Sequence, residues 1–181
     1  LKPRVGSIGS TLVWPSMASC LNEAAGHPVA NVFNEGASFL QSDADHQLLL
    51  NIPFAQPVGI SGLRIWSQGE EAPAKLKLFI NNPTFGFDDA EATVALQEVE
   101  LTEDDVANGT PVPLKLAKFR NVHSLQIFVE ENRGAEVTRI HRLDFLGEKT
   151  KDGASEAAEG FGLPIPTGFK LDTSKTPSYF S

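Results

Sequence analysis

The sequence predicts an all-β protein, an antiparallel β-sandwich or jelly roll with one or two short helical turns. Apolar residues alternate with other residues in several short runs, which is the pattern of strands that bury one face. Residues that favour turns separate these runs, and helix-like signals are confined to two short segments, 88–92 and 102–105. Many short strands with turns between them are typical of two stacked antiparallel layers.

The first well-patterned strands lie between residues 48 and 80. Residues 48–54 alternate as Leu, Leu, Leu, Asn, Ile, Pro, Phe, and we expect Pro53 at an edge or unpaired position because it has no N–H to donate. Gln56-Pro57 is interpreted as a turn, which separates this strand from a second at 63–66. A third strand is predicted over 75–80, where Lys and Leu alternate strictly.

Short helical turns and tight turns are expected between the strands. Asp88 to Ala92 begins with acids, which suit a helix N-terminus. Thr102 to Asp105 has the spacing of a capping box, and Asn108-Gly109 marks a turn after it. Ser42 to Asp45 has the same spacing, but a strand follows, so we predict a tight turn there.

The C-terminal strands are predicted to form a hairpin. Residues 125–130 alternate, residues 131–134 are Glu-Asn-Arg-Gly, and residues 137–147 form a second β-rich run. Ile140 and Leu143 are three residues apart, so a regular pleat would place them on opposite faces. A β-bulge between them would bring both to one face. The alternative is a strand covered on both faces.

Length and composition indicate a single folded domain. We expect a flexible arm at 1–9, the sandwich at 10–150, and an extended tail at 151–181 that packs in part on the domain. The net charge of −8 disfavours nucleic acid as a partner. One Cys among 181 residues excludes an internal disulfide framework, and no apolar segment is long enough to cross a bilayer. Because the chain begins with Leu1, we expect a fragment.

Catalytic and metal chemistry find little support in the sequence. The four histidines have none of the close spacings of a zinc site. Asp43 and Asp45 resemble the start of a calcium loop, but the Gly and Glu that such a loop requires are missing, and carboxylates that cap a turn are the preferred interpretation. Cys20 is expected to be a buried or unreactive thiol. We therefore predict no enzyme activity and no cofactor.

The distribution of charge suggests a surface for a partner. Eight acids and no basic residue lie between Asn81 and Val112, and a run of basic residues follows. Segregated charge can steer a partner and orient it, although two ordinary solvated faces would give the same pattern. Trp66 is a candidate anchor, with simple edge packing as the alternative. The candidate partner-binding residues are Lys115, Lys118, Arg120, Arg139, His141, Arg142 and Trp66.

Several short blocks, taken in order, resemble the PITH domain, the C-terminal proteasome-interacting module of thioredoxin-like proteins. The blocks lie between Cys20 and Gly147 and include Cys20-Leu21-Asn22-Glu23, the segments 39–49 and 54–58, Lys118-Phe119-Arg120-Asn121-Val122 and Thr138-Arg139-Ile140. The resemblance implies a galactose-binding-like jelly roll and a non-catalytic role in docking on the regulatory particle of the 26S proteasome. It also implies a cytoplasmic location, with the nucleus as a second compartment, and we expect a monomer.

Two questions stay open at this point. Some family members carry a thioredoxin domain ahead of this module. This chain is expected either to have had that domain removed or to be a stand-alone member. The sequence has no CxxC motif for redox chemistry. The alternative function is a carbohydrate- or small-ligand-binding jelly roll, in which Trp66 would stack on a sugar ring.

Overall fold

The computed structural model describes residues 6–8 and 12–150, so most of the predicted arm (1–9) and the whole predicted tail (151–181) lie outside the described residues. The helices are α2 (Phe87–Ala92) and α3 (Glu103–Asn108), with short 3-10 segments η1 (Pro15–Met17), η2 (Val29–Phe33) and η3 (Gly69–Glu71). The strands are β1 (Gly6–Ser7), β2 (Ser19–Leu21), β3 (Leu40–Gln41), β4 (Leu48–Trp66), β5 (Pro73–Ile80), β6 (Gln97–Glu100), β7 (Val112–Pro113), β8 (Val122–Asn132), β9 (Arg139–Ile140) and β10 (Arg142–Lys149).

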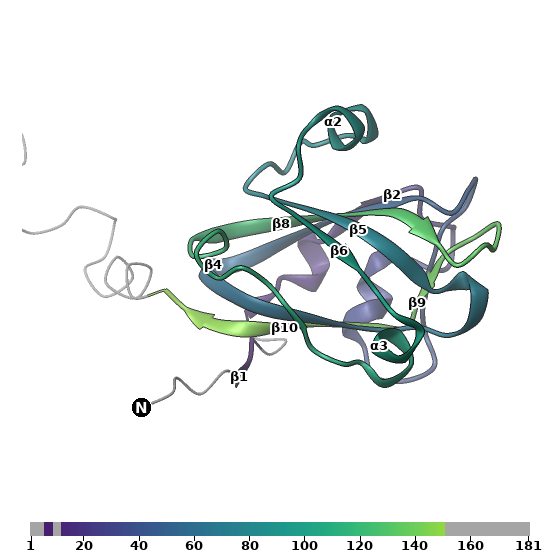
Figure 1. Ribbon diagram of the computed structural model, residues 1–181, viewed down its shortest axis with the longest axis horizontal. Coiled ribbons are helices and arrows are strands. Elements are labelled where there is room, and N and C mark those ends of the chain that lie inside the picture. The colour runs from purple at the N-terminus through teal and green to yellow at the C-terminus, as the bar shows by residue number, and fades with distance from the viewer. Residues whose placement is uncertain (1–5, 9–11, 151–181) are drawn as a thin grey trace, which may run out of the picture. The chain divides into compact units, whose positions relative to one another are not determined.

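The long strand β4 takes part in both layers of the sandwich (Figure 1). Its first half, residues 48–53, pairs with β8 on one side and with β2 on the other. Its second half, residues 58–66, pairs with β10 and β7. One layer is therefore β2-β4-β8-β5-β6, the other is β1-β10-β4-β7, and all pairs are antiparallel. The predicted all-β, antiparallel fold class is confirmed.

The turn predicted at Gln56-Pro57 is wrong. Both residues lie inside β4, at a point where the ladder between β4 and β8 is interrupted from Pro53 to Val58. This interruption lets one continuous strand pass from one layer to the other. Pro53 is the last regularly paired residue before it, opposite Ser124. A proline in a turn and a proline at an interrupted point of a long strand look alike in sequence, which explains the error at Pro57.

The hairpin predicted between residues 125–130 and 137–147 is also wrong. β8 pairs with β4 and β5, while β10 pairs with β4 and β1, so β4 lies between the two strands. Residues 139–140 form β9, which pairs with β3 instead. Alternation identifies a strand, but it does not identify the strand's partner, and the connection after β8 crosses to another layer (Figure 1).

The β-bulge predicted between Ile140 and Leu143 is wrong, because the chain changes strands there and the register shift of β10 lies at Leu146 and Gly147. β9 ends at Ile140 and β10 begins at Arg142, and the backbone N–H of His141 between them donates to the carbonyl of Trp66 at 2.8 Å. This break in the strand allows Ile140 and Leu143 both to be buried.

The main core lies between the two layers. Leu48, Leu50 and Ile52 of β4 are fully buried there, as the alternation predicted, and burial of each side chain contributes about 1.5–3 kcal/mol. Strands β5, β8 and β10 supply most of the rest. These residues include Leu76, Leu78, Leu125, Ile127, Val129, Leu143 and Phe145.

A second, smaller cluster covers the outer face of the β4-β8-β5 layer. Leu49 and Phe128 face away from the main core and are covered by the segment around α2, to which Ala90 belongs. The Phe87 and Phe128 rings meet edge to face, with centroids 6.0 Å apart. The middle of this layer is thus apolar on both faces, which explains why Leu49 and Phe128 interrupt a simple alternation of apolar and polar residues.

Helix α3 forms as its capping box predicts. The Thr102 hydroxyl accepts from the Asp105 N–H at 3.1 Å, and the Asp105 carboxylate accepts from the Thr102 N–H at 2.9 Å. These hydrogen bonds with Thr102 lower the pKa of Asp105. The helix ends at Gly109, whose φ of +61° is in the left-handed region that favours glycine.

Candidate partner-binding surface

Trp66 and Arg142 form the centre of the candidate surface. Trp66 ends β4 and Arg142 begins β10, and the two are register partners in the antiparallel pair. The guanidinium carbon of Arg142 lies 5.1 Å from the centroid of the Trp66 ring, which is a cation–π geometry. Trp66 is half-buried, whereas Arg142 is exposed. The arrangement presents a positive charge on a fixed aromatic base.

Gly109, which follows α3, lies close to the Trp66 indole. A Cβ atom on Gly109 would lie 2.0 Å from Cε2 of the Trp66 indole, so a side chain at this position would collide with the ring. The same glycine has a positive φ, so it is required both for the end of the helix and for the close approach. The predicted turn at Asn108-Gly109 therefore has a second role, which the sequence did not indicate.

A second aromatic group surrounds Phe39, just before β3. The His27 ring is stacked on Phe39 with centroids 4.3 Å apart, and the His141 ring lies 5.7 Å away on another side. The guanidinium carbon of Arg139 is 5.0 Å from the Phe39 centroid. His141 and Arg139 come from the predicted set, but His27 and Phe39 were not predicted. They lie in or next to a region without periodic pattern, so no sequence signal identified them.

Arg139 is held by polar contacts on both sides. Its Nη1 lies 3.0 Å from Oε2 of Glu71, and its Nε donates to Oε1 of Gln41 at 2.8 Å. Its carbonyl accepts from the Ser67 hydroxyl, next to Trp66. The charge of Arg139 is therefore largely compensated inside the protein, and Arg142 is the more available cation for a partner.

Lys115, Lys118 and Arg120 belong to a different place, the loop between β7 and β8. All three side chains are exposed. The Lys118 ammonium donates to the carbonyl of Leu96 at 3.1 Å, and the Lys115 backbone N–H donates to the Gln97 side chain at 2.9 Å. We call these three residues the basic loop, and we call Trp66, Phe39, Arg139, His141 and Arg142 the aromatic–arginine surface.

The two groups lie near opposite ends of the β4–β10 ladder. The Arg120 carbonyl is 3.7 Å from the position of a Cβ on Gly59, which pairs with Glu148 near the end of β10. Trp66 pairs with Arg142 at the other end. At the rise of a strand, the distance along β4 from Gly59 to Trp66 is about 23 Å. The structure therefore separates the seven predicted residues into two groups.

Lys75, Lys77 and Glu130 form a separate charged cluster. On β5 and β8, Lys75 and Lys77 contact the two carboxylate oxygens of Glu130 at 2.8 and 2.7 Å. Hydrogen bonds from Lys75, and then from Lys77, lower the pKa of Glu130, and the hydrogen bond to Glu130 raises the pKa of Lys75. These ion pairs link β5 to β8, so the cluster supports the fold.

The residues considered above as a nucleophile or as metal ligands, Cys20 and Asp45, lie in surroundings that do not favour these roles. Burial, followed by the nearby charge of Glu23, raises the pKa of the Cys20 thiol, which opposes formation of a nucleophilic thiolate. Oδ1 of Asp45 accepts from the Gln47 N–H at 2.8 Å and from the Asn22 amide at 2.9 Å, so the turn predicted here is confirmed. Within residues 6–8 and 12–150, no three His, Cys, Asp or Glu side chains gather as metal ligands would.

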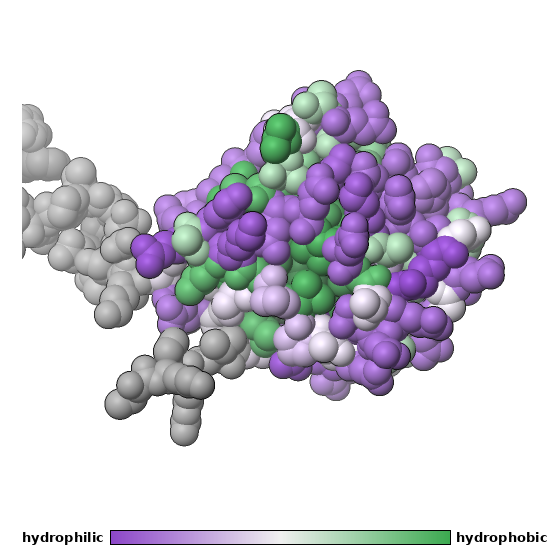
Figure 2. Space-filling view, viewed as in Figure 1, coloured by the Kyte–Doolittle hydropathy of each residue, from purple (hydrophilic) through white to green (hydrophobic). Residues whose placement is uncertain are grey.

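Some large apolar side chains are exposed outside the aromatic–arginine surface. The face seen in Figure 2 is mostly hydrophilic, with hydrophobic residues concentrated toward its centre. Among the described residues, the exposed large apolar side chains include Val94, at 93%, and Trp14 and Met17, which lie together at η1. None of the helices in the described part of the chain has the length and apolar composition needed to cross a membrane.

Comparison with solved structures finds domains of similar fold. The family 32 carbohydrate-binding module of Clostridium perfringens NanJ, solved with galactose, matches 75% of this chain and 98% of its own at a TM-score of 0.56 and 14% identity. The C-terminal domain of a Bacteroides fragilis chitobiase matches 81% of this chain and 100% of its own, with a TM-score of 0.58 and 12% identity. At these identities the likeness concerns the fold alone.

Sequence comparison identifies the family. Thioredoxin-like protein 1 of Schizosaccharomyces pombe is 38% identical over 75% of this chain and 49% of its own length. PITH domain-containing protein 1 is 37% identical in Danio rerio and 32% identical in Homo sapiens, in each case over 73% of this chain and 65% of the relative. The chain thus spans half to two thirds of these relatives. The family model described as the PITH domain matches residues 11–159, and the chain therefore belongs to the PITH domain family.

Proposed function

We propose that this chain is a non-catalytic interaction module that docks on the regulatory particle of the 26S proteasome, in the cytoplasm and also in the nucleus. Membership of the PITH family supports the general role. The observation that carries the proposal in this chain is Arg142 over the half-buried ring of Trp66, with Gly109 beneath the same indole. Trp and Arg are the residue types that most often dominate the energy of protein interfaces.

The contact would work through shape and charge. Trp66 is already held by Gly109 and Arg142, so little conformational entropy is lost when a partner covers it. Arg142 offers its charge to a carboxylate, whereas Arg139 is compensated by Glu71.

Proteasome capture from cytosol by the immobilised chain tests the proposal. We expect regulatory-particle subunits in the eluate. The double reversal Arg139→Glu/Arg142→Glu is expected to reduce their yield by about tenfold, because it replaces attraction by repulsion at the partner. The matched reversal Lys115→Glu/Arg120→Glu changes the net charge equally but alters the basic loop. Failure of the wild-type chain to retain these subunits would contradict the proposal.

Sugar binding is the alternative, supported by the galactose complex among the related folds. A sugar ring could stack on Trp66 only by displacing Arg142 or by using a part of the ring that Gly109 leaves open. A glycan array with the wild-type chain and Trp66→Ala separates the two functions. Clear sugar binding that disappears with Trp66→Ala, without proteasome capture, would favour the alternative.

A further inference from the structure

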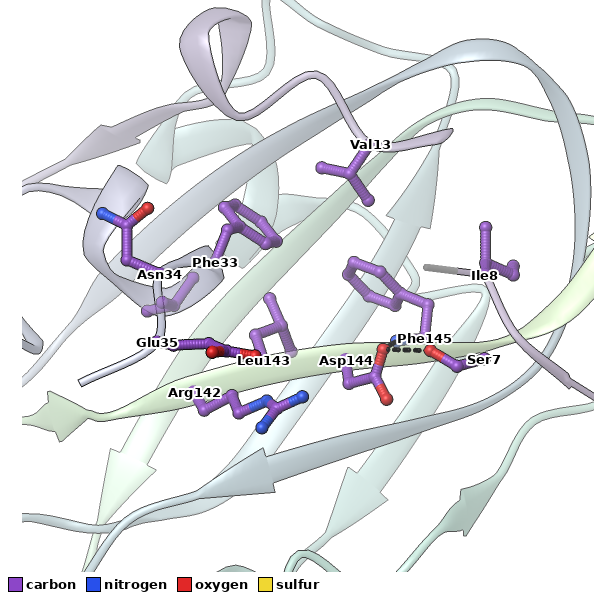
Figure 3. Close-up of a pocket in the computed structure, with 11 residues that line it drawn as sticks. Ser7, Ile8, Val13, Phe33, Asn34, Glu35, Arg142, Leu143, Asp144 and Phe145 are labelled. Carbon is purple, nitrogen blue, oxygen red and sulfur yellow. Dashed lines mark hydrogen bonds between the residues drawn. The ribbon is translucent and has the colours of Figure 1, made fainter. Parts of the chain in front are cut away.

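Two arginines are diagonal neighbours on the outer face of the β4–β10 pair. In the antiparallel register Arg142 lies opposite Trp66, and Asp144 lies opposite Arg64. Side chains that are opposite each other, or two residues apart along a strand, share one face of a sheet. Figure 3 shows Arg142 and Asp144 leaving β10 on one side and Leu143 leaving it on the other. The Cβ atoms of Arg64 and Arg142 are therefore about 7 Å apart, a separation that two long side chains can bridge.

Arg64 has a donor that the protein does not satisfy. Its Nε is buried and has no hydrogen-bond partner among the described residues, although the side chain as a whole is half-buried. A buried N–H without an acceptor is costly, because it has given up its water and received nothing in exchange. An acceptor from a ligand on this face would remove that cost.

The carboxylate opposite Arg64 is engaged elsewhere. Oδ1 of Asp144 accepts from the Ser7 hydroxyl at 2.7 Å (Figure 3) and from the Phe145 N–H at 3.0 Å. Within residues 6–8 and 12–150, no ion pair joins Asp144 to Arg64. Asp144 lowers the positive potential of the face, but it leaves the Arg64 Nε without an acceptor.

Arg142 supplies the second cation. Its side chain is exposed, and its guanidinium lies over the Trp66 ring, which restrains it beside Arg64. In the described part of the chain Arg142 takes part in no ion pair. A guanidinium carries five N–H donors in a planar fork, and contact with the face of a ring uses none of them. These donors are therefore free for an acceptor on the same face as Arg64.

We infer that Arg64 and Arg142 together bind one phosphate-type oxyanion on the outer face of the β4–β10 pair. The paired donors of a guanidinium match the oxygens of phosphate. Phosphate has enough oxygens to accept from both arginines at once, whereas a carboxylate has only two. Free phosphate and a phosphorylated side chain of another protein share this chemistry. The site involves no proteasome subunit, so the inference goes beyond the proposed function.

Nuclear magnetic resonance of the ¹⁵N-labelled chain tests the inference. Inorganic phosphate is titrated into the chain at about pH 7 and at constant ionic strength, with acetate as the carboxylate control. The arginine Nε–H signals report on each side chain separately. We expect the signals of Arg64 and Arg142 to shift and saturate together, while that of Arg120 shifts little. Acetate should bind at least about fivefold more weakly than phosphate.

Four variants locate the anion, after thermal unfolding has confirmed that each is folded. Arg64→Gln and Arg142→Gln each remove one guanidinium and should weaken phosphate binding by about tenfold. Arg120→Gln removes the same charge from the basic loop and should leave binding within about twofold of wild type. Asp144→Asn removes the neighbouring negative charge while its Oδ1 can still accept from Ser7. It should strengthen binding by about two- to fivefold.

A short peptide with one phosphoserine between glycines distinguishes the two sources of the phosphate group. Binding at least about fivefold tighter than that of inorganic phosphate would assign the site to a phosphorylated side chain. Equal or weaker binding would assign it to the free ion.

The outcomes separate a site from general attraction to positive charge. Equal shifts at Arg64, Arg142 and Arg120 would mean that phosphate gathers near every cation, and the inference would fail. Phosphate binding that is unchanged in Arg64→Gln and in Arg142→Gln would overturn it as well. If Arg64→Gln does not fold, the loss in Arg142→Gln and the gain in Asp144→Asn decide the question. None of these measurements uses the proteasome, so a negative result leaves the docking proposal intact.

Discussion

The aromatic–arginine surface and the basic loop contain similar numbers of cations, but they differ in how the side chains are held. Arg142 lies over Trp66, and Arg139 lies over Phe39 while it pairs with Glu71. In the basic loop, the one side-chain hydrogen bond with a described residue runs from Lys118 to a backbone carbonyl. A preorganised surface loses less entropy on binding than a mobile one. Charge alone therefore does not identify the surface that a partner would use.

The largest expected effect comes from breaking the support of Trp66. Gly109→Ala should lower the free energy of unfolding by about 2–4 kcal/mol, because it adds left-handed strain and a collision with the indole. Gly69 is a matched control, since its φ of +66° is similar and no atom lies within 4 Å of its Cβ position. Gly69→Ala should cost about 1 kcal/mol. Urea denaturation of both variants measures the difference, and equal losses would show that Gly109 does not support Trp66.

Glu130 provides a third case for comparison with the two surfaces, because its charge is paired within the protein by Lys75 and Lys77. Glu130→Gln should destabilise the fold by about 0.2–1 kcal/mol at neutral pH and leave proteasome capture unchanged. Folding lowers the pKa of Glu130 below its ordinary value of 4.5, so its stabilising effect is present above that value and disappears as the pH falls through the folded-state pKa.

Denaturation of Glu130→Gln and wild type at neutral pH and at about pH 3 measures this dependence. The gap between the two proteins should narrow at the lower pH. A gap that stays constant would assign the loss to side-chain packing, and reduced capture would extend the partner surface onto β8.

The ion pair between Arg139 and Glu71 should contribute less to the free energy of unfolding than the pairs of Glu130 do. Both side chains are about one third exposed, so a double-mutant cycle with Arg139→Gln and Glu71→Gln should give a coupling of about 0.2–0.5 kcal/mol. High salt should reduce this coupling. A coupling above 1 kcal/mol would mean that Glu71 is a main determinant of the aromatic–arginine surface.

The smallest effect is expected in the basic loop. Arg120→Ala should change the free energy of unfolding by less than about 0.5 kcal/mol, as for most exposed positions. Capture of the proteasome should also stay within about twofold. A large loss of capture with an unchanged unfolding curve would make the basic loop the partner surface.

Much of the fold was predictable from local patterns, but its strand pairing was not. The alternation at Leu48, Leu50 and Ile52 identified a buried strand face, and Thr102 with Asp105 identified the start of α3. Both signals depend on neighbours in sequence. The long course of β4 through both layers depends on residues far apart in the chain, and for that reason Gln56-Pro57 was misinterpreted as a turn.

The candidate site was predictable only in part. Trp66, Arg139, His141 and Arg142 were singled out by residue type and charge, and the structure brings them together. Lys115, Lys118 and Arg120 follow the same logic but lie at the other end of the ladder. His27 lies in a region with no periodic pattern and Phe39 lies just after it, so their proximity to His141 and Arg139 follows from tertiary packing.

Photo-crosslinking tests the central claim most directly. A photoreactive amino acid is placed at Gln68, an exposed residue two positions after Trp66, or at Asn121, an exposed residue next to Arg120. Each variant is mixed with purified 26S proteasome, irradiated and analysed for crosslinked subunits. We expect crosslinks to regulatory-particle subunits from Gln68 and few from Asn121. Crosslinks from Asn121 alone would contradict the assignment of the aromatic–arginine surface as the docking surface.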